Sequence, residues 1–125
     1  MNRSIRIPDA SHPITIESNP RRVVVTVKGR VVADTRAALT LREARYDPVQ
    51  YVPMADVDAT LLAPSQTTTY CPYKGDCAYF DVVVGDERVA DAIWTYRSPY
   101  DAVAAIRDHV AFYPDRVDAI DERAS

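Results

Sequence analysis

Glycine and cysteine are both scarce in this chain, which contains 3 glycines and 2 cysteines among 125 residues. Phosphate-binding loops need glycines in a fixed pattern, and neither G-x-x-x-x-G-K-[S/T] nor G-x-G-x-x-G occurs. The two cysteines lie six residues apart, and with only 2 histidines they are too few and too badly spaced for a zinc site. The sequence therefore predicts no intrinsic metal and no cofactor.

An excess of positive charge is absent as well. The 15 basic residues are outnumbered by 18 acidic ones, which gives a formal net charge of −3. Nucleic-acid-binding domains usually carry a basic stripe, so we expect no nucleic-acid partner. No apolar run approaches the roughly 20 residues that cross a bilayer. The N-terminal stretch MNRSIRIPDASHPITIES also lacks the apolar core of a secretory signal, so we expect no membrane partner and a cytoplasmic location.

Short segments with strand-like patterns dominate the chain. A length of 125 residues with 47% apolar content is typical of a single globular domain. Alternating or β-rich runs occur at residues 23–27, 31–34, 39–44, 49–52, 79–84, 89–96 and 110–113. The sequence therefore predicts a mainly β fold, a compact antiparallel domain built as a small β barrel or as two packed sheets.

One segment near the C-terminus, residues 99–108, favours an α-helix instead. Ser98 is suited to the N-cap and Pro99 to the first helical position, because the missing N–H of proline is not needed there. Val103 and Ile106 would then face inward on one side of the helix. We expect this short α-helix to be the one helix of consequence.

The segment TTTYCPYKGDCAYFDVVV, residues 67–84, predicts a tight reversal that carries chemistry. Pro72 presets a turn angle and Gly75 tolerates positive φ. Cys71 is a candidate nucleophile, because a cysteine gains reactivity when a positive neighbour such as Lys74 lowers its pKa. The alternative is an inert, half-buried thiol beside a solvated lysine. Lys74 is also a candidate for binding an anion, helped by the N–H groups of the turn.

Glu43 occupies an unusual place in its predicted strand. Leu39, Leu41 and Glu43 share one face, so the carboxylate lies in an otherwise apolar row and must be paired or neutralised. Arg42 cannot pair with Glu43 directly, since neighbouring residues of a strand point to opposite faces; Lys74 is a suitable partner. Glu43 is then either a structural ion-pair member or a general acid or base with a raised pKa.

Large aromatic side chains form a third candidate feature. Trp94 and Tyr96 share one face of their predicted strand, where they either form the floor of a ligand groove or fill the core. The chain holds 8 tyrosines against 2 phenylalanines. Buried hydroxyls need hydrogen-bond partners, so some of these tyrosines, Tyr51 among the candidates, should line a wet cavity or the surface.

Five stretches together resemble a known family. They are ADTRAALTLRE at 33–43, YVPMADV at 51–57, TYCPYKG at 69–75, AIWTY at 92–96 and AFYPDRV at 111–117. In this order the chain is similar, from about residue 13 to residue 117, to the domain-of-unknown-function family DUF427, which also has a nucleotidyltransferase-like name. The family positions fall on Asp34, Thr35, Arg36, Arg42, Glu43, Tyr51, Cys71, Lys74, Trp94 and Tyr96.

The resemblance implies a compact, Mss4-like β architecture and no established activity. The Gly-Ser followed by paired aspartates that holds magnesium in nucleotidyltransferases is missing here. The family commonly has a small residue such as alanine at the position of Cys77, which argues against an obligatory redox couple between Cys71 and Cys77.

Two classes of function follow from these residues. The first is a small-molecule-binding module whose groove, lined by Arg42, Tyr51, Lys74, Trp94 and Tyr96, accepts an anionic or planar ligand. The second is an enzyme of unknown class that uses Cys71 or Glu43. In both cases we expect these seven side chains to converge on one concave surface. No oligomeric state follows from the sequence.

Overall fold

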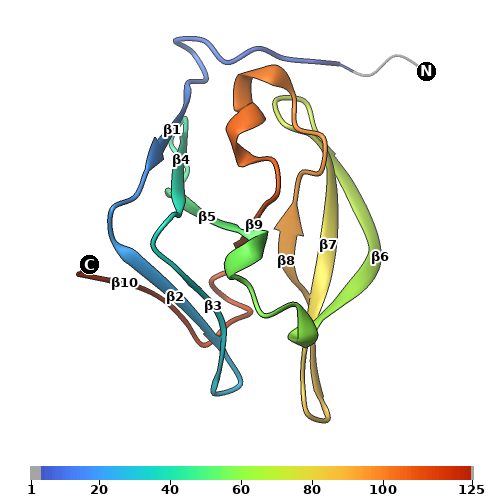
Figure 1. Cartoon of the computed structure of the whole chain (residues 1–125). Coiled ribbons are helices and arrows are strands. Elements are labelled where there is room, and N and C mark those ends of the chain that lie inside the picture. Colours follow the sequence, from blue (N-terminus) through green and yellow to red (C-terminus); the bar gives the residue numbers. More distant parts are fainter. Residues whose placement is uncertain (1–3, 125) are drawn as a thin grey trace.

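Ten short strands carry most of the secondary structure in the computed structural model, which describes residues 4–124 (Figure 1). Their bounds are β1 Ile14–Ser18, β2 Arg22–Val27, β3 Arg30–Thr35, β4 Leu39–Glu43, β5 Val49–Pro53, β6 Leu62–Cys71, β7 Gly75–Val84, β8 Glu87–Thr95, β9 His109–Phe112 and β10 Ala119–Arg123. Three short 3₁₀ helices complete the described structure: η1 Met54–Asp56, η2 Ala59–Leu61 and η3 Asp101–Ile106. The predicted mainly β fold is confirmed.

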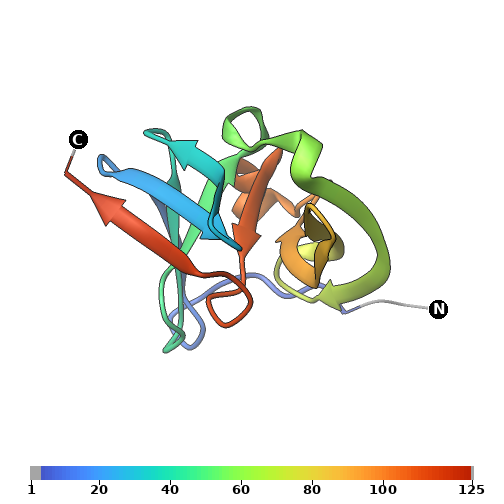
Figure 2. The same cartoon turned by 90° about the horizontal axis from the view of Figure 1, so that it is seen from below.

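The strands form two antiparallel sheets. The larger sheet has seven strands in the order β1-β4-β5-β9-β8-β7-β6, and the smaller has the order β10-β2-β3. The smaller sheet lies beside the β4–β5 end of the molecule, away from the β6–β7 hairpin (Figures 1 and 2). The two-sheet alternative is therefore right. Within residues 4–124 the larger sheet ends at β1 and β6, and no closed barrel is found.

The two faces of the larger sheet have different hydrophobic clusters. One cluster, here called the valine core, joins that sheet to β2 and β3 and consists mainly of aliphatic side chains. Its fully buried members include Val23, Val25, Val27, Val32, Val52, Val82, Ile93 and Val110. The other cluster combines Leu41, Cys77 and three tyrosines with Val103 and Ile106 of η3. Side chains alternate between faces along a strand, so neighbours such as Ile93 and Trp94 serve different clusters.

The predicted α-helix at residues 99–108 is wrong. A 3₁₀ helix covers Asp101–Ile106, and Val103 interrupts its regularity with φ −125° and ψ 25°. Val103 and Ile106 do face inward, both with no exposed surface. Two apolar anchors three residues apart match the three-residue repeat of a 3₁₀ turn, and a segment this short gains little from α-helical propagation.

The predicted reversal after Cys71 is confirmed. β6 ends at Cys71, β7 begins at Gly75, and the Lys74 N–H donates to the Cys71 carbonyl at 3.2 Å. Gly75 has φ +110°, and a Cβ there would lie 3.3 Å from the Ser98 carbonyl oxygen. Glycine therefore satisfies both the backbone angle and the close approach of the segment that leads to η3.

The segment 4–13 crosses this reversal before the chain enters β1 (Figure 1). The Arg6 N–H donates to the Pro72 carbonyl at 2.9 Å, and the Tyr70 hydroxyl donates to the Ser4 carbonyl at 2.7 Å. This segment brings a histidine, His12, to the edge of β4. None of the helices found in residues 4–124 has the length and apolar character needed to cross a membrane.

Candidate functional site

A cavity of about 390 Å³ lies at the second hydrophobic cluster, and we call it the tyrosine pocket. Its walls come from β4, β5, β7 and β8, from the β6–β7 reversal, and from residues just beyond β4, β8 and β9. The lining residues are Leu41, Glu43, Tyr46, Val49, Tyr51, Cys71, Lys74, Cys77, Tyr79, Trp94, Tyr96 and Tyr113. Half of the lining residues are therefore aromatic, and there is one charged group from β4 and one from the reversal.

Strand alternation explains why these side chains meet. Trp94 of β8 and Tyr96, which directly follows β8, are two residues apart and share a face. The register places Tyr79 of β7 directly opposite Trp94. On β5, Tyr51 points into the pocket, whereas its neighbour Val52 belongs to the valine core. The pocket is thus the ring-bearing face of the curved seven-stranded sheet.

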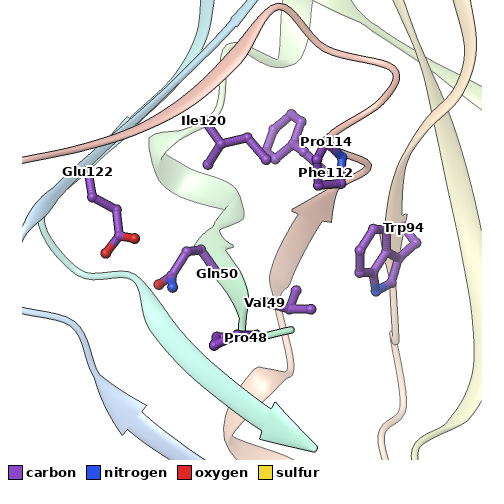
Figure 3. Close-up of a pocket in the computed structure, with 8 residues that line it drawn as sticks. All are labelled: Pro48, Val49, Gln50, Trp94, Phe112, Pro114, Ile120 and Glu122. Carbon is purple, nitrogen blue, oxygen red and sulfur yellow. The ribbon is translucent and has the colours of Figure 1, made fainter. Parts of the chain in front are cut away.

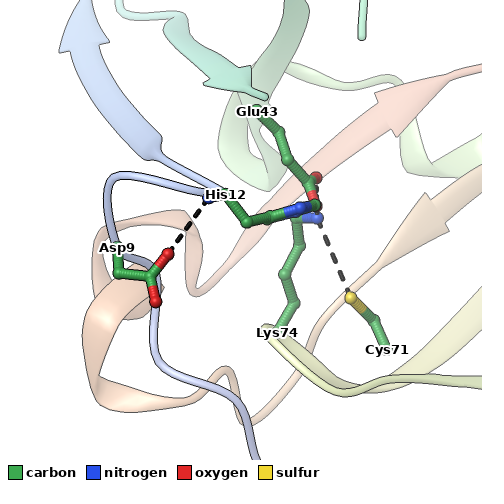
Figure 4. Close-up of polar contacts among 5 residues, drawn as sticks. All are labelled: Asp9, His12, Glu43, Cys71 and Lys74. Atoms are coloured by element: carbon green, nitrogen blue, oxygen red, sulfur yellow. Dashed lines mark hydrogen bonds and ion pairs between the residues drawn. The ribbon is translucent and has the colours of Figure 1, made fainter. Parts of the chain in front are cut away.

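Lys74 and Glu43 form an ion pair inside the pocket. The Lys74 Nζ donates to Glu43 Oε1, and the two side chains are 8% and 15% exposed. The predicted partnership of these residues is confirmed. The second carboxylate oxygen, Oε2, lies 2.7 Å from Nε2 of His12 (Figure 4). The His12 ring stacks on Tyr73 at a centroid distance of 4.1 Å.

Two hydrogen bonds hold Glu43 in its ionised form. Burial alone would raise the pKa of this carboxyl, but the hydrogen bonds from Lys74 and His12 outweigh burial and lower the pKa below its ordinary value. The hypothesis that Glu43 has a raised pKa is therefore wrong. The pKa is lowered because two hydrogen-bond donors, Lys74 and His12, converge on the Glu43 carboxylate, which would otherwise be unpaired in an apolar row.

Cys71 lies next to this ion pair, with its Sγ 3.9 Å from Lys74 Nζ (Figure 4). The side chain is half-buried, and it lines the cavity. Cys77 lines the same cavity from β7 but is buried, and burial raises the pKa of its thiol. Both thiols are free.

The aromatic rings are held by hydrogen bonds and by edge contacts. The indole N–H of Trp94 donates to the Tyr51 hydroxyl at 3.1 Å, and the two rings meet edge to face. Trp94 also lies against Tyr113, with ring centroids 4.4 Å apart. Burial raises the pKa of Tyr51, Tyr79 and Tyr96, so their hydroxyls stay neutral near pH 7.

The comparison with protein families covers this pocket and most of the chain. The model described as "Domain of unknown function (DUF427)", with the short name NTP_transf_9, matches residues 15–123. The chain belongs to the DUF427 family. A comparison with curated proteins finds no significant match. The short name refers to nucleotide transfer, but the family description assigns no activity. Among residues 4–124 of this DUF427 chain, no group of three or more metal-binding side chains comes together.

Six of the seven predicted site residues line the tyrosine pocket of this DUF427 domain. They are Glu43, Tyr51, Cys71, Lys74, Trp94 and Tyr96. Arg42 does not join them, so the prediction that it converges with the others is wrong. Its side chain lines a separate hollow with Thr40 and Gln50, on the opposite face of β4 from Glu43. The same alternation that excludes an Arg42–Glu43 pair places Arg42 outside the pocket.

Other pocket residues were not predicted from the sequence. Cys77 is a buried member of the second hydrophobic cluster and also lines the cavity. Sequence position could have predicted Tyr79 and Tyr113 as pocket residues, because Tyr79 follows Cys77 at strand spacing and Tyr113 directly follows β9. No sequence signal indicated His12: it is 31 residues from Glu43 in sequence, and only the path of the N-terminal segment brings the two together.

A second hollow lies beyond Trp94, and it shares Val49 and Trp94 with the tyrosine pocket (Figure 3). Its polar side chains, Gln50 and Glu122, both accept hydrogen bonds from the Asn19 amide, at 2.9 and 2.8 Å. These bonds join β5 to β10, so the polar groups of this hollow have a structural role in holding the two sheets together.

Proposed function

We propose that this DUF427 domain binds a small, planar, uncharged organic molecule in the tyrosine pocket. The supporting observation is a cavity of about 390 Å³ with walls of aromatic rings and a buried Lys74–Glu43 pair among its polar groups. Cavities of this size, mostly apolar with a few fixed polar groups, are typical of small-ligand sites. Rings offer flat contact surface, and the polar groups orient the ligand.

The charges favour a neutral ligand over the anionic alternative. The Lys74 ammonium already has Glu43 as its counter-ion, so a second anion would lie beside a carboxylate that stays ionised. Arg42, which was expected to supply a further positive charge, lines a different hollow. The neutral tyrosine hydroxyls add hydrogen-bonding groups without charge.

The only tryptophan of the chain, Trp94, provides a direct test, since its fluorescence reports on the pocket itself. We expect saturable quenching or enhancement with benzamide, and a clearly weaker response with benzoate, which has the same ring but a negative charge. Lys74→Met should abolish the benzamide response. Arg42→Met removes the same kind of charge outside the pocket and should leave the response unchanged.

An outcome with no saturable signal from either probe, and no thermal shift across a screen of planar metabolites, would contradict the proposal. An equal loss of the benzamide fluorescence response in Lys74→Met and Arg42→Met would show that the response depends on overall charge and not on the pocket.

An enzyme that uses Cys71 is the second candidate function, and one observation favours it: the half-buried Sγ lies 3.9 Å from a buried ammonium. Glu43 is a poor general acid because its pKa is lowered. The rate of iodoacetamide alkylation of Cys71 against pH, measured in Cys77→Ala, separates the candidates. A rate that stays high below the ordinary thiol range favours an enzyme, and a slow reaction favours binding alone.

A further inference from the structure

We propose that Cys71 and Lys74 together recognise a carbonyl group of the ligand, and that the ligand class is planar aromatic aldehydes, held as a reversible thiol adduct. The inference rests on the proposed function, because it names the ligand class of the tyrosine pocket. It is based on the position of two groups that line one cavity, a half-buried thiol and a buried ammonium.

The hydrogen bonds of Lys74 support the first half of the proposal. An ammonium group has three N–H donors. Among residues 4–124, its hydrogen-bond acceptors are one oxygen, Glu43 Oε1, and one sulfur, Cys71 Sγ at 3.9 Å. Lys74 is only 6% exposed, so water has little access to the remaining donor capacity. A buried donor of this kind is suited to an oxygen acceptor supplied by a ligand in the cavity.

The position of Cys71 supports the second half. Sulfur and nitrogen are separated by 3.9 Å, which a carbonyl group spans when its carbon bonds to Sγ and its oxygen accepts from Nζ. Lys74 is the partner of an ionised carboxylate and is therefore an ammonium, which has no free electron pair and does not attack the carbonyl. The thiol is then the nucleophile and Lys74 the proton donor.

The adduct forms without any co-reactant. A lone pair of Cys71 Sγ forms a bond to the aldehyde carbon, and the π electrons of the C=O bond move to oxygen. That oxygen takes a proton from the Lys74 ammonium, and the proton released by the thiol restores the ammonium. The net change is the addition of S–H across C=O, which gives a hemithioacetal with no oxidation or reduction. The Tyr51, Trp94 and Tyr113 rings provide apolar surface for the aromatic part.

Benzaldehyde labelled with carbon-13 at the carbonyl is the test ligand, and NMR of the full chain is the measurement. We expect the label to move from the aldehyde region to that of a tetrahedral carbon bonded to oxygen and sulfur. The signal should disappear in Cys71→Ser, and it should persist in Arg42→Met, whose changed side chain lies outside the pocket. Lys74→Met should reduce the adduct population about tenfold or more, the scale of one hydrogen bond from a charged donor. The chain unfolded in urea should give no such signal.

Three outcomes would overturn the inference: a tetrahedral signal that survives in Cys71→Ser, an imine signal on Lys74, or bound benzaldehyde whose label stays an aldehyde. If benzamide binds but benzaldehyde gives no adduct, the proposed function stands and this inference fails. If neither binds, both fail. Should Cys71→Ser not fold, methyl methanethiosulfonate blocks the half-buried Cys71 of the folded parent chain in preference to the buried Cys77, and loss of the adduct there is the expected result.

Discussion

The valine core and the tyrosine pocket lie on opposite faces of the same seven-stranded sheet, yet one is filled and the other is hollow. The valine core consists mainly of short aliphatic side chains, most of them completely buried. The tyrosine pocket is lined by aromatic side chains, most of which end in a hydroxyl group, beside an ion pair and two thiols. Branched aliphatic groups interlock at high density, whereas a hydroxyl must reach a partner, which fixes the ring and prevents it from filling space freely.

Neighbouring residues on single strands show how the difference arises. Ile93 belongs to the valine core and Trp94 to the pocket; on β5, Val52 and Tyr51 divide in the same way. Alternate residues of the same strands therefore belong to a stabilising core and to a candidate binding surface. Mutations at adjacent positions should consequently have different effects on stability and on binding.

The largest effect should come from Ile93→Ala in the valine core. Ile93 has no exposed surface, so the truncation removes buried apolar area and leaves a cavity. We expect a loss of about 2–5 kcal/mol in the free energy of unfolding, measured by denaturant titration. Benzamide binding by the folded fraction should be retained, since the side chain points away from the pocket. A loss below about 0.5 kcal/mol would show that this face is not tightly packed.

Lys74→Met should destabilise the protein less, yet remove binding. The change keeps the apolar stem of the side chain but leaves the Glu43 carboxylate with His12 as its remaining partner. Because both side chains of the pair are largely buried, we expect a cost of about 1–3 kcal/mol. Denaturant unfolding gives this cost, and Lys74→Met combined with Glu43→Gln should cost less than the sum of the single changes. Additive costs would contradict a direct pairing.

The dependence of stability on pH should identify Glu43. Its pKa is lowered in the folded state, so its contribution is complete above its ordinary value of 4.5 and is lost as the pH falls through the lowered value. The difference in unfolding free energy between the parent chain and Glu43→Gln should therefore be present at pH 7 and shrink below pH 4.5. We expect this pH-dependent difference to be about 1 kcal/mol or less. A difference that grows on acidification would contradict the assignment.

The smallest effect should come from Tyr113→Phe at the pocket wall. The Tyr113 hydroxyl donates to the Tyr79 hydroxyl at 3.5 Å, the outer limit for a hydrogen bond. We expect a change below about 0.5 kcal/mol. Tyr79→Phe is the matched control, since it loses a 2.9 Å contact with Thr69 and should cost about 1 kcal/mol. Equal costs in thermal or denaturant unfolding would show that the two hydroxyls are held equally.

Much of the fold could be predicted because its signals are local. Alternation identified β2, β3, β5, β8 and β9, and Pro72 with Gly75 identified the reversal that separates β6 from β7. The segment at 99–108 was predicted wrongly, because two apolar residues three apart fit an α-helix and a 3₁₀ turn equally well. Closure of a sheet depends on its edge strands, and β1 carries no local signal that would have excluded a barrel.

The sequence by itself determined which side chains could share a face: Glu43 with Leu41, Trp94 with Tyr96, and Arg42 away from Glu43. These relations follow from the two-residue period of a strand and need no knowledge of the fold. Only the tertiary structure decided which faces meet. It brought His12 to Glu43 across 31 residues and curved the sheet so that β4 and β8 line one cavity. Such contacts depend on how the sheets pack and not on local preference, so they leave no periodic signal in the chain.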